Sequence, residues 1–352
     1  MSKPTIKDVA KKAGHSIATV SRVFNPKEEG AYVHSDTRRQ VLQAAESLGY
    51  FPNQAARTMR GKKTHRVSLL TSHSKDIMRS RYHTHLLSGI LDGLVDSSYS
   101  LQINLLKDKQ YSSLEELLHE FSVDGLFILT WRIHPNIIRL IESCPENFPV
   151  MLFNDFDRKV KANFVYCDVG LGMEMAVKYL IEKGRKKIAF LKGPGLIRFG
   201  KDPNTVTVPS IDARDKFEGF KKAMKESGLS VISEWVRECE AYTKDEGYRQ
   251  TNVLIGGKNL PDAVLCSNDD LALGSLEALR EHKISCPKEI AVMGFDGIET
   301  GAYTTPPLTT VEQLLEQMGM EGAQKLVDIL DEKKIDPIHV GFVPKLLIRK
   351  SA

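Results

Sequence analysis

Apolar residues near the start of the chain recur every three or four positions, the spacing of one helix face, in three short segments. These segments cover residues 5–13, 16–24 and 35–48. Three short helices of this kind can share one small core, although a unit of this size is near the lower limit for a self-standing domain. The positions predicted to point inward are Ile6, Val9, Val20, Val23, Thr37, Val41, Leu42, Ala45 and Leu48.

Capping residues indicate where these helices begin and end. Thr5 can cap the first helix, and Asp8 can accept the return hydrogen bond of a capping box. Gly14 suits the left-handed residue that ends a helix, while Ser16 and Ser35 can cap the next two helices. Two short helices joined by a glycine-containing turn are typical of a helix-turn-helix, but any small helical hairpin has the same pattern. The spacing alone therefore leaves both interpretations open.

From Val67 onward the pattern changes to apolar strands that alternate with helices. The predicted strands are residues 67–71, 101–106, 125–130, 150–154, 164–167, 187–191, 263–267 and 290–295. The predicted helices are residues 84–96, 114–121, 136–143, 173–183, 213–227, 244–255, 271–282 and 313–333. This alternation predicts an α/β fold with parallel sheets covered on both faces. One closed barrel or two doubly wound lobes would fit, and the aperiodic stretch 157–162 favours two lobes.

Several polar residues directly follow predicted strands. In doubly wound sheets, ligands bind at the carboxyl ends of the strands. We therefore expect these side chains to face a ligand-binding cleft. They are Ser72, Asp155, Asn268, Asp269 and Asp296.

Composition indicates a soluble globular protein, with 41% apolar and 27% charged residues in a chain of 352. No apolar run is long enough to span a bilayer, and the N-terminus lacks the apolar segment of a signal peptide. The five cysteines are scattered without a C-x-x-C pair, so neither a disulfide framework nor a zinc site is expected. We expect a cytoplasmic protein without a metal or cofactor.

The net charge of +4 conceals an asymmetry. Residues 1–66 contain 13 Lys and Arg against 5 Asp and Glu, whereas the remainder contains 36 against 40. A basic segment beside a mildly acidic one indicates that the first part meets a polyanion. Residues 53–60 could form a two-turn helix with Arg57 and Arg60 beside the apolar Ala56 and Met59. Such a helix suits a minor-groove element, and an ordinary basic linker is the alternative.

An enzyme is the main competing interpretation of an α/β chain. Gly195–Lys201 satisfies the spacing G-x-x-x-x-G-K after a strand, but Asp202 replaces the Ser or Thr that would hold magnesium. No G-x-G-x-x-G after a strand, G-x-S-x-G or H-E-x-x-H is present, and no catalytic residue is predicted. The carboxylates Asp269 and Asp270 could form a catalytic pair, but neighbours at a strand–helix junction more often divide between capping and ligand binding. A ligand-binding protein with an incidental basic segment and a nucleoid-type architectural protein are further alternatives.

Taken together, these motifs resemble the LacI/GalR family of bacterial transcription regulators. The matching segments are Thr5–Val23, Leu48–Arg57, Ser267–Gly274, Gly294–Asp296 and Pro306–Val311, and they extend over essentially the whole chain. The combination is far more specific than any one piece. The resemblance implies a helix-turn-helix domain (1–51), a hinge helix and linker (52–63), and a two-lobed effector-binding and dimerisation domain (64–352) like a periplasmic sugar-binding protein.

The resemblance also implies a homodimer or dimer of dimers on a pseudo-palindromic double-stranded DNA operator. The second helix would enter the major groove, with Ile17, Ala18 and Arg22 towards bases and nearby hydroxyls towards phosphates. Ile17 and Ala18 can contact only thymine methyls, so Arg22 is expected to make the strong base contact. Met59 stands where the family has a wedging Leu. The residues expected to contact DNA are Thr5, Ser16, Ile17, Ala18, Thr19, Ser21, Arg22, Asn25, Asn53, Ala56, Arg57 and Met59.

The implied effector is a small molecule, and we expect a sugar or sugar derivative, with sugar phosphates and purines left open. Lys216 replaces the usual family Arg, which is not a conservative exchange, and Arg214 could take over its role. Tyr242 would supply a stacking ring, and the stretch 193–210 is longer than is usual. Whether the effector is an inducer or a corepressor is open. The residues expected to contact it are Ser72, Asp155, Arg214, Lys216, Tyr242, Asn268, Asp269 and Asp296.

Overall fold

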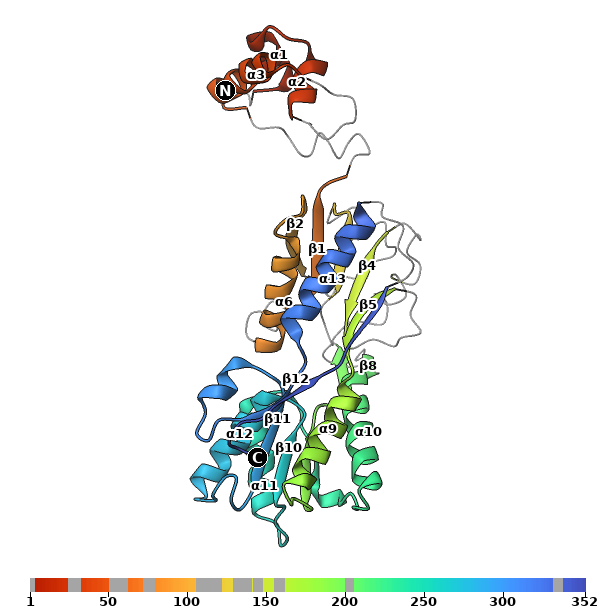
Figure 1. Ribbon diagram of the computed structural model, residues 1–352, viewed down its shortest axis with the longest axis vertical. Helices are drawn as coiled ribbons and strands as arrows, with labels where there is room; N and C mark the ends of the chain where they lie inside the picture. The colour runs from red at the N-terminus through yellow and green to blue at the C-terminus, as the bar shows by residue number, and fades with distance from the viewer. Residues whose placement is uncertain are drawn as a thin grey trace. The chain divides into compact units, whose positions relative to one another are not determined.

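The structure is a computed structural model (Figure 1). It describes residues 4–24, 33–50, 63–71, 80–105, 122–128, 141, 148–154, 162–199, 206–331 and 338–352. The chain divides into two compact units, Met1–Thr64 and His65–Ala352. Each unit is considered by itself.

The first unit contains the three predicted helices, α1 (Ile6–Ala13), α2 (Ile17–Phe24) and α3 (Ser35–Leu48). Val9, Val20 and Val41 are fully buried at the centre of their shared core, with Ile6 and Leu48 at its edge. Gly14 has φ +69°, as expected for the left-handed residue that ends a helix. The prediction that Leu42 points inward is wrong, since it is 46% exposed and Ala44 takes the inward position. His34, not Ser35, caps α3.

The second unit contains two sheets, which confirms two lobes and excludes the closed barrel. Lobe N has six parallel strands in the order β13-β5-β4-β3-β1-β2. They are β1 (Arg66–Thr71), β2 (Ser100–Leu105), β3 (Gly125–Ile128), β4 (Val150–Phe153), β5 (Asn163–Cys167) and β13 (His339–Phe342). Helices α6 (Arg81–Leu94) and α13 (Leu315–Leu330) pack side by side over this sheet (Figure 1). Their approach is so close that a Cβ on Gly89 would lie 2.0 Å from the Glu316 carbonyl oxygen.

Lobe C has the sheet order β14-β12-β11-β10-β6-β9, parallel except for β14. Its strands are β6 (Ile188–Lys192), β9 (Val236–Glu238), β10 (Ala263–Cys266), β11 (Ala291–Asp296), β12 (Thr309–Glu312) and β14 (Lys345–Leu347). Its helices are α9 (Val169–Glu182), α10 (Ile211–Glu226), α11 (Lys244–Ile255) and α12 (Asp269–Glu281). Alternate residues of β6 enter opposite cores, Phe190 with α9 and α10 and Leu191 with α11 and α12.

The chain passes between the lobes three times, after β5, after β12 and after β13. The strands β12, β13 and β14 were not among the predicted elements. The stretch 193–210, expected as a loop, contains the antiparallel hairpin of β7 (Leu196–Phe199) and β8 (Val206–Pro209). The predicted helix 114–121 and nearly all of the predicted helix 136–143 lie outside the described residues. No helix among the described residues is long and apolar enough to cross a membrane.

Candidate functional site

The outer face of α2 carries the side chains predicted to contact bases. Ile17 is 43% exposed although it is large and apolar, and Ala18 and Arg22 are also exposed. Val20 and Val23, on the opposite face, are buried in the core. The side chains predicted to contact bases thus lie on the solvent-facing side of α2, opposite its buried face.

The hydroxyl groups predicted to contact phosphates are already engaged in holding the helices. The Thr5 backbone N–H donates to Asp8 Oδ2 at 2.8 Å, so the return hydrogen bond of the capping box is confirmed, and the Thr5 hydroxyl donates to the same oxygen at 2.7 Å. Ser16 Oγ accepts from the Thr19 backbone N–H at 3.0 Å and lies 2.9 Å from Thr19 Oγ1. Ser21 is partly buried. Asn25, Asn53, Ala56, Arg57 and Met59 lie outside the described residues.

Of the predicted effector residues of lobe C, Tyr242 and Asp296 lie near the ammonium of Lys216, which is on α10. Lys216 is only 3% exposed, and its ammonium lies 3.0 Å from Asp212 Oδ1 and donates to the Ser267 carbonyl at 3.0 Å. It also lies 4.4 Å from the centre of the Phe295 ring. The Tyr242 hydroxyl donates to Asp212 Oδ2 at 2.8 Å. The cation of Lys216 is therefore balanced within the protein.

Asp296 lies beside this cluster at the end of β11. It is 8% exposed and accepts a hydrogen bond from the Gln313 side chain at 2.7 Å. Burial raises the pKa of the Asp296 carboxyl well above its usual range, and the nearby Lys216 ammonium offsets part of the rise. A carboxyl group that retains its proton can donate a hydrogen bond to a ligand oxygen.

Asn268 and Asp269, at the start of α12, both accept hydrogen bonds from groups within the protein. Asn268 caps this helix by accepting from the Leu271 N–H at 2.9 Å. Asp269 has no exposed surface and accepts from the N–H groups of Gly297 and Ile298 and from the Thr310 hydroxyl. Burial raises the pKa of Asp269 to about 7 despite these hydrogen bonds. The expectation that Asp269 faces the cleft finds no support in this geometry.

Arg214 is placed apart from the Lys216 ammonium. Its side chain is 61% exposed, and its guanidinium donates to the adjacent Asp215 at 2.8 Å. In this arrangement it does not take over the role of the family arginine. The two remaining predicted residues, Ser72 and Asp155, lie outside the described residues.

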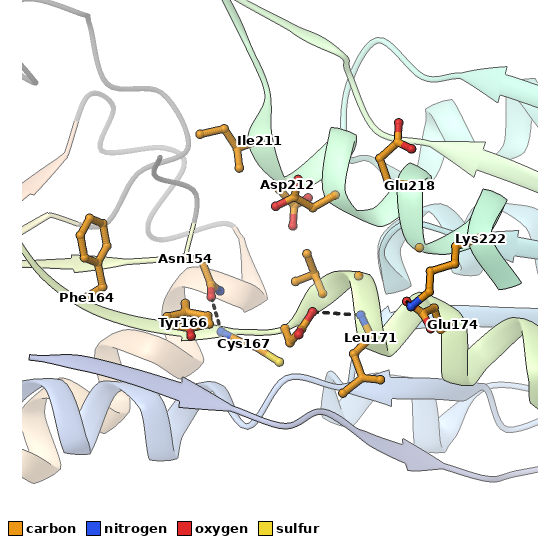
Figure 2. Close-up of a pocket in the computed structure, with 15 residues that line it drawn as sticks. Asn154, Phe164, Tyr166, Cys167, Leu171, Glu174, Ile211, Asp212, Glu218 and Lys222 are labelled. Atoms are coloured by element: carbon orange, nitrogen blue, oxygen red, sulfur yellow. Dashed lines mark hydrogen bonds and ion pairs between the residues drawn. The ribbon is translucent and has the colours of Figure 1, made fainter. Parts of the chain in front are cut away.

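A cavity of about 490 Å³ opens between the lobes and adjoins this cluster through Asp212 (Figure 2). Lobe N contributes Asn154 and the aromatic side chains of Phe164 and Tyr166 on β5. Cys167, at the end of β5, also lines the cavity. Lobe C contributes residues from the start of α9, including its cap, and from α10. These are Asp168, Val169, Gly170, Leu171, Glu174, Ile211, Asp212, Asp215, Glu218, Gly219 and Lys222. The cavity has the size and the mixed aromatic and polar lining of a small-molecule site.

None of the residues that line the cavity was among those predicted to contact the effector. Asp168 directly follows β5, so the rule that selected Asp155 and Asp296 would also have selected it. Asp212 lies four residues before Lys216, one helical turn away, and could have been found as its salt-bridge partner. The positions of Phe164 and Tyr166 depend on how β5 crosses between the lobes, and no local pattern reveals this.

Two family models match the chain. The model described as bacterial regulatory proteins of the lacI family matches residues 5–53. The model of a periplasmic binding protein-like domain matches residues 177–352, which include most of lobe C. The matches therefore fall on the helix-turn-helix unit and on the lobe that holds the Lys216 cluster.

Whole-chain relatives agree with these matches. The transcriptional repressor PurR of Haemophilus influenzae (strain PittEE) is 30% identical over 99% of this chain and 98% of its own length. The solved lac repressor dimer bound to operator and the anti-inducer ONPF has a TM-score of 0.82 at 24% identity, over 99% of both chains. The CelR–cellobiose complex has a TM-score of 0.67 at 24% identity, over 99% of this chain and 100% of that one. The chain belongs to the LacI family of bacterial regulatory proteins, and it is a DNA-binding transcriptional repressor, not an enzyme.

Proposed function

We propose that this repressor is controlled by an uncharged, hydroxyl-rich small molecule, a sugar or sugar derivative, bound in the cavity between the lobes. The observation that carries the proposal is the cavity of about 490 Å³, which both lobes line and which Asp212 joins to the Lys216 cluster. A ligand in contact with both lobes favours one of their relative arrangements over another. Differential binding of this kind is the requirement for control at a distance.

The lining supports a ligand with hydroxyl groups and an apolar face. Asn154, Asp168 and Asp212 offer hydrogen-bonding groups at different points of the cavity, and Phe164 and Tyr166 are the aromatic residues of its lining. Aromatic rings pack well against apolar surfaces, including the C–H face of a sugar ring. A planar purine could use the same rings, so purines remain the competing class. In a solved relative, CelR, the bound molecule is cellobiose.

The charges argue against an acidic or phosphorylated effector. The ammonium of Lys216 is already paired with Asp212 and bonded to the Ser267 carbonyl. The cation of Lys222 is likewise paired with Glu174 at 2.8 Å. An anionic ligand would therefore have to displace a carboxylate from its partner, and it would also meet the Asp168 carboxylate. This cost falls on a charged ligand and not on a neutral one.

We further propose that the chain acts as a homodimer on a pseudo-palindromic operator. Lobe N exposes apolar side chains on α6, directly after it and on β2, namely Leu91 at 48%, Val95 at 73% and Ile103 at 42% exposure. A second copy of the chain is the occupant that we assign to this face, and the solved lac repressor is itself a dimer. In each copy Arg22 would contact bases, and Met59 of the hinge would enter the minor groove.

A thermal-shift screen with the full chain tests the effector class. The panel contains neutral sugars, their matching sugar acids and sugar phosphates, and purines. We expect a neutral sugar to raise the melting temperature and to change the affinity for an operator duplex recovered from a random library by selection. The matched control is Tyr303→Phe, an exposed tyrosine distant in sequence from the cavity residues, which should leave the shift unchanged. A response to sugar phosphates alone, or to purines alone, would overturn the assignment.

A further inference from the structure

The second passage between the lobes contains a glutamine whose amide bonds to both of them. Gln313 follows β12 and is only 1% exposed. Its amide nitrogen donates to Asp296 Oδ1 of lobe C at 2.7 Å. Its amide oxygen accepts from Asn154 Nδ2 of lobe N at 3.3 Å. A single buried side chain therefore connects the ends of β11 and β4.

Asn154 extends this connection within lobe N in two directions. Its amide nitrogen also donates to the hydroxyl of Tyr82, the second residue of α6. Its amide oxygen accepts from the backbone N–H of Cys167 at 2.8 Å, at the end of β5, where the chain first leaves lobe N (Figure 2). Two of the three passages between the lobes are thus joined through two amide side chains.

The polarity of these amides makes the chain of hydrogen bonds directional. An amide has donors on nitrogen and acceptors on oxygen, so Gln313 satisfies both an ionised Asp296 and the Asn154 amide in the observed orientation. A rotated Gln313 amide would place its nitrogen against the Asn154 nitrogen, and its oxygen could bond to Asp296 only if that carboxyl were protonated. A change in what Asp296 binds must therefore be accommodated by Gln313, and then by Asn154, because buried polar groups are costly to leave unpaired.

The backbone at the same three points adopts a sparsely populated conformation. Asn154 has φ +56°, Asp296 has φ +117° and Leu314, next to Gln313, has φ +60°. Among the described residues only three other non-glycine residues have positive φ, namely His65, Ser122 and Lys283. Strained backbone of this kind collects at switch regions and persists only where surrounding contacts hold it.

We propose that Asp296, Gln313, Asn154 and Tyr82 form an interlobe relay, which couples the end of β11 in lobe C to the start of α6 in lobe N. Gln313 is a positioning residue in this proposal, since it acts through Asp296 and Asn154. The inference rests on the proposed function, in which the effector contacts Asn154 in the cavity lining. It adds the path by which that contact changes the relation between the lobes.

Hydrogen exchange of the full chain, without any effector, tests the relay. Gln313→Met has a similar volume and removes both hydrogen bonds. It should speed exchange about fivefold, the factor expected for one net hydrogen bond, at residues 80–86 and 163–168. Neither segment contacts Gln313 directly through a hydrogen bond among those described. A merely local role would change exchange only at residues 311–316, and that result would overturn the proposal.

Asn154→Asp tests the relay from the other side. The carboxylate keeps acceptors for the Cys167 N–H and for the Tyr82 hydroxyl, but it has no donor for Gln313. Exchange should therefore accelerate at residues 311–316. The matched control is Asn163→Asp, on the neighbouring strand of the same sheet, where the amide bonds to Val150 and Ile338 and should leave residues 311–316 unchanged. Equal effects of the two Asn→Asp changes would count against the relay.

Operator binding separates failure of the relay from failure of the proposed function. The ratio of operator affinities with and without cellobiose, ribose or adenine is measured for the unsubstituted chain and for Gln313→Met. Where this ratio differs from one for the unsubstituted chain, the same ratio measured for Gln313→Met should lie within about twofold of one. An unchanged ratio in Gln313→Met would contradict the relay. If no compound changes operator binding, the effector proposal fails, while the exchange data still decide on the relay.

Discussion

The ammonium of Lys216 and the carboxylate of Asp212 lie 3.0 Å apart, one helical turn from each other on α10. The lysine is 3% exposed and the aspartate 20%, so water screens this pair weakly. Asp212 also accepts from the Tyr242 hydroxyl, and Lys216 donates to the Ser267 carbonyl. The pair thus ties three elements of lobe C together at the edge of the cavity.

Removal of Lys216 should destabilise the protein, because it leaves the Asp212 carboxylate without its partner. We expect Lys216→Met to cost about 3 kcal/mol, the lower end of the range for breaking a buried pair, since Asp212 retains some solvent. Adding Asp212→Asn should recover most of this loss, because an amide still accepts from Tyr242. Lys222→Met, on the exposed face of α10, should cost below about 1 kcal/mol. Denaturant unfolding of the four chains measures these differences.

The buried carboxyl of Asp269 should make stability depend on pH. Its pKa in the folded state is about 7, above the unfolded value near 3.9, so the folded state binds the proton more tightly. Stability therefore falls as the pH rises from about 4 to about 7 and is level above that range. Asp269→Asn cannot ionise and removes this contribution. As the pH falls from 7 to 5, the free energy of unfolding of the unsubstituted chain should rise relative to that of Asp269→Asn by up to about 1.4 kcal/mol per pH unit.

Melting temperatures at pH 5, 6, 7 and 8 provide the measurement. Asp92→Asn, on the exposed side of α6, is the control and should track the unsubstituted chain at every pH. The ionisation of Asp296 acts in the same direction, and the Asp269 carboxylate itself helps to raise the Asp296 pKa, so Asp269→Asn also removes that part of the Asp296 contribution. A constant difference between Asp269→Asn and the unsubstituted chain across this range would contradict the assignment.

Sequence patterns predicted the described α-helices and most of the buried strands, although not β12, because these elements have strong local signals. Phe190 and Leu191 face opposite cores, so β6 is apolar throughout and easy to recognise. The strands β13 and β14 are short and partly exposed, and β14 has only three residues, of which Lys345 is exposed. They form only by pairing with segments that are distant in the sequence. Their existence depends on topology, which the local pattern does not contain.

The site could be predicted where a residue's role follows from its position on a strand. Asp296 was found in this way, and it does lie beside Lys216. Asp269 was selected by the same rule, but its carboxyl group stabilises the fold instead. It accepts hydrogen bonds from one donor on β12 and from two backbone N–H groups that follow β11. The relay residues Gln313 and Asn154 were missed because their roles arise from a meeting of segments 159 residues apart.

The close approach of α9 and α10 beside the cavity depends on Gly219. A Cβ at this position would lie 2.2 Å from the carbonyl oxygen of Gly170, so the helices would have to separate. Gly219→Ala should destabilise the protein by about 1–3 kcal/mol, even though alanine gains about 1 kcal/mol in helix propensity. In Gly256→Ala the nearest atom to the new Cβ is 3.4 Å away, so this control should be nearly neutral. Thermal unfolding distinguishes them, and equal melting temperatures would rule out the packing argument.

The exposed guanidinium of Arg22 should determine much of the operator selectivity, because Ile17 and Ala18 offer bases only apolar contacts. Arg22→Ala should lower the preference for the selected operator over a scrambled duplex by about 1–3 kcal/mol. Lys11→Ala, which removes an exposed cation from α1, should instead weaken binding to both duplexes alike. Fluorescence anisotropy with both duplexes at several salt concentrations separates these effects. If Arg22→Ala lowered both affinities equally, Arg22 would be a phosphate contact and selectivity would have to come from Ile17, Ala18 or the hinge.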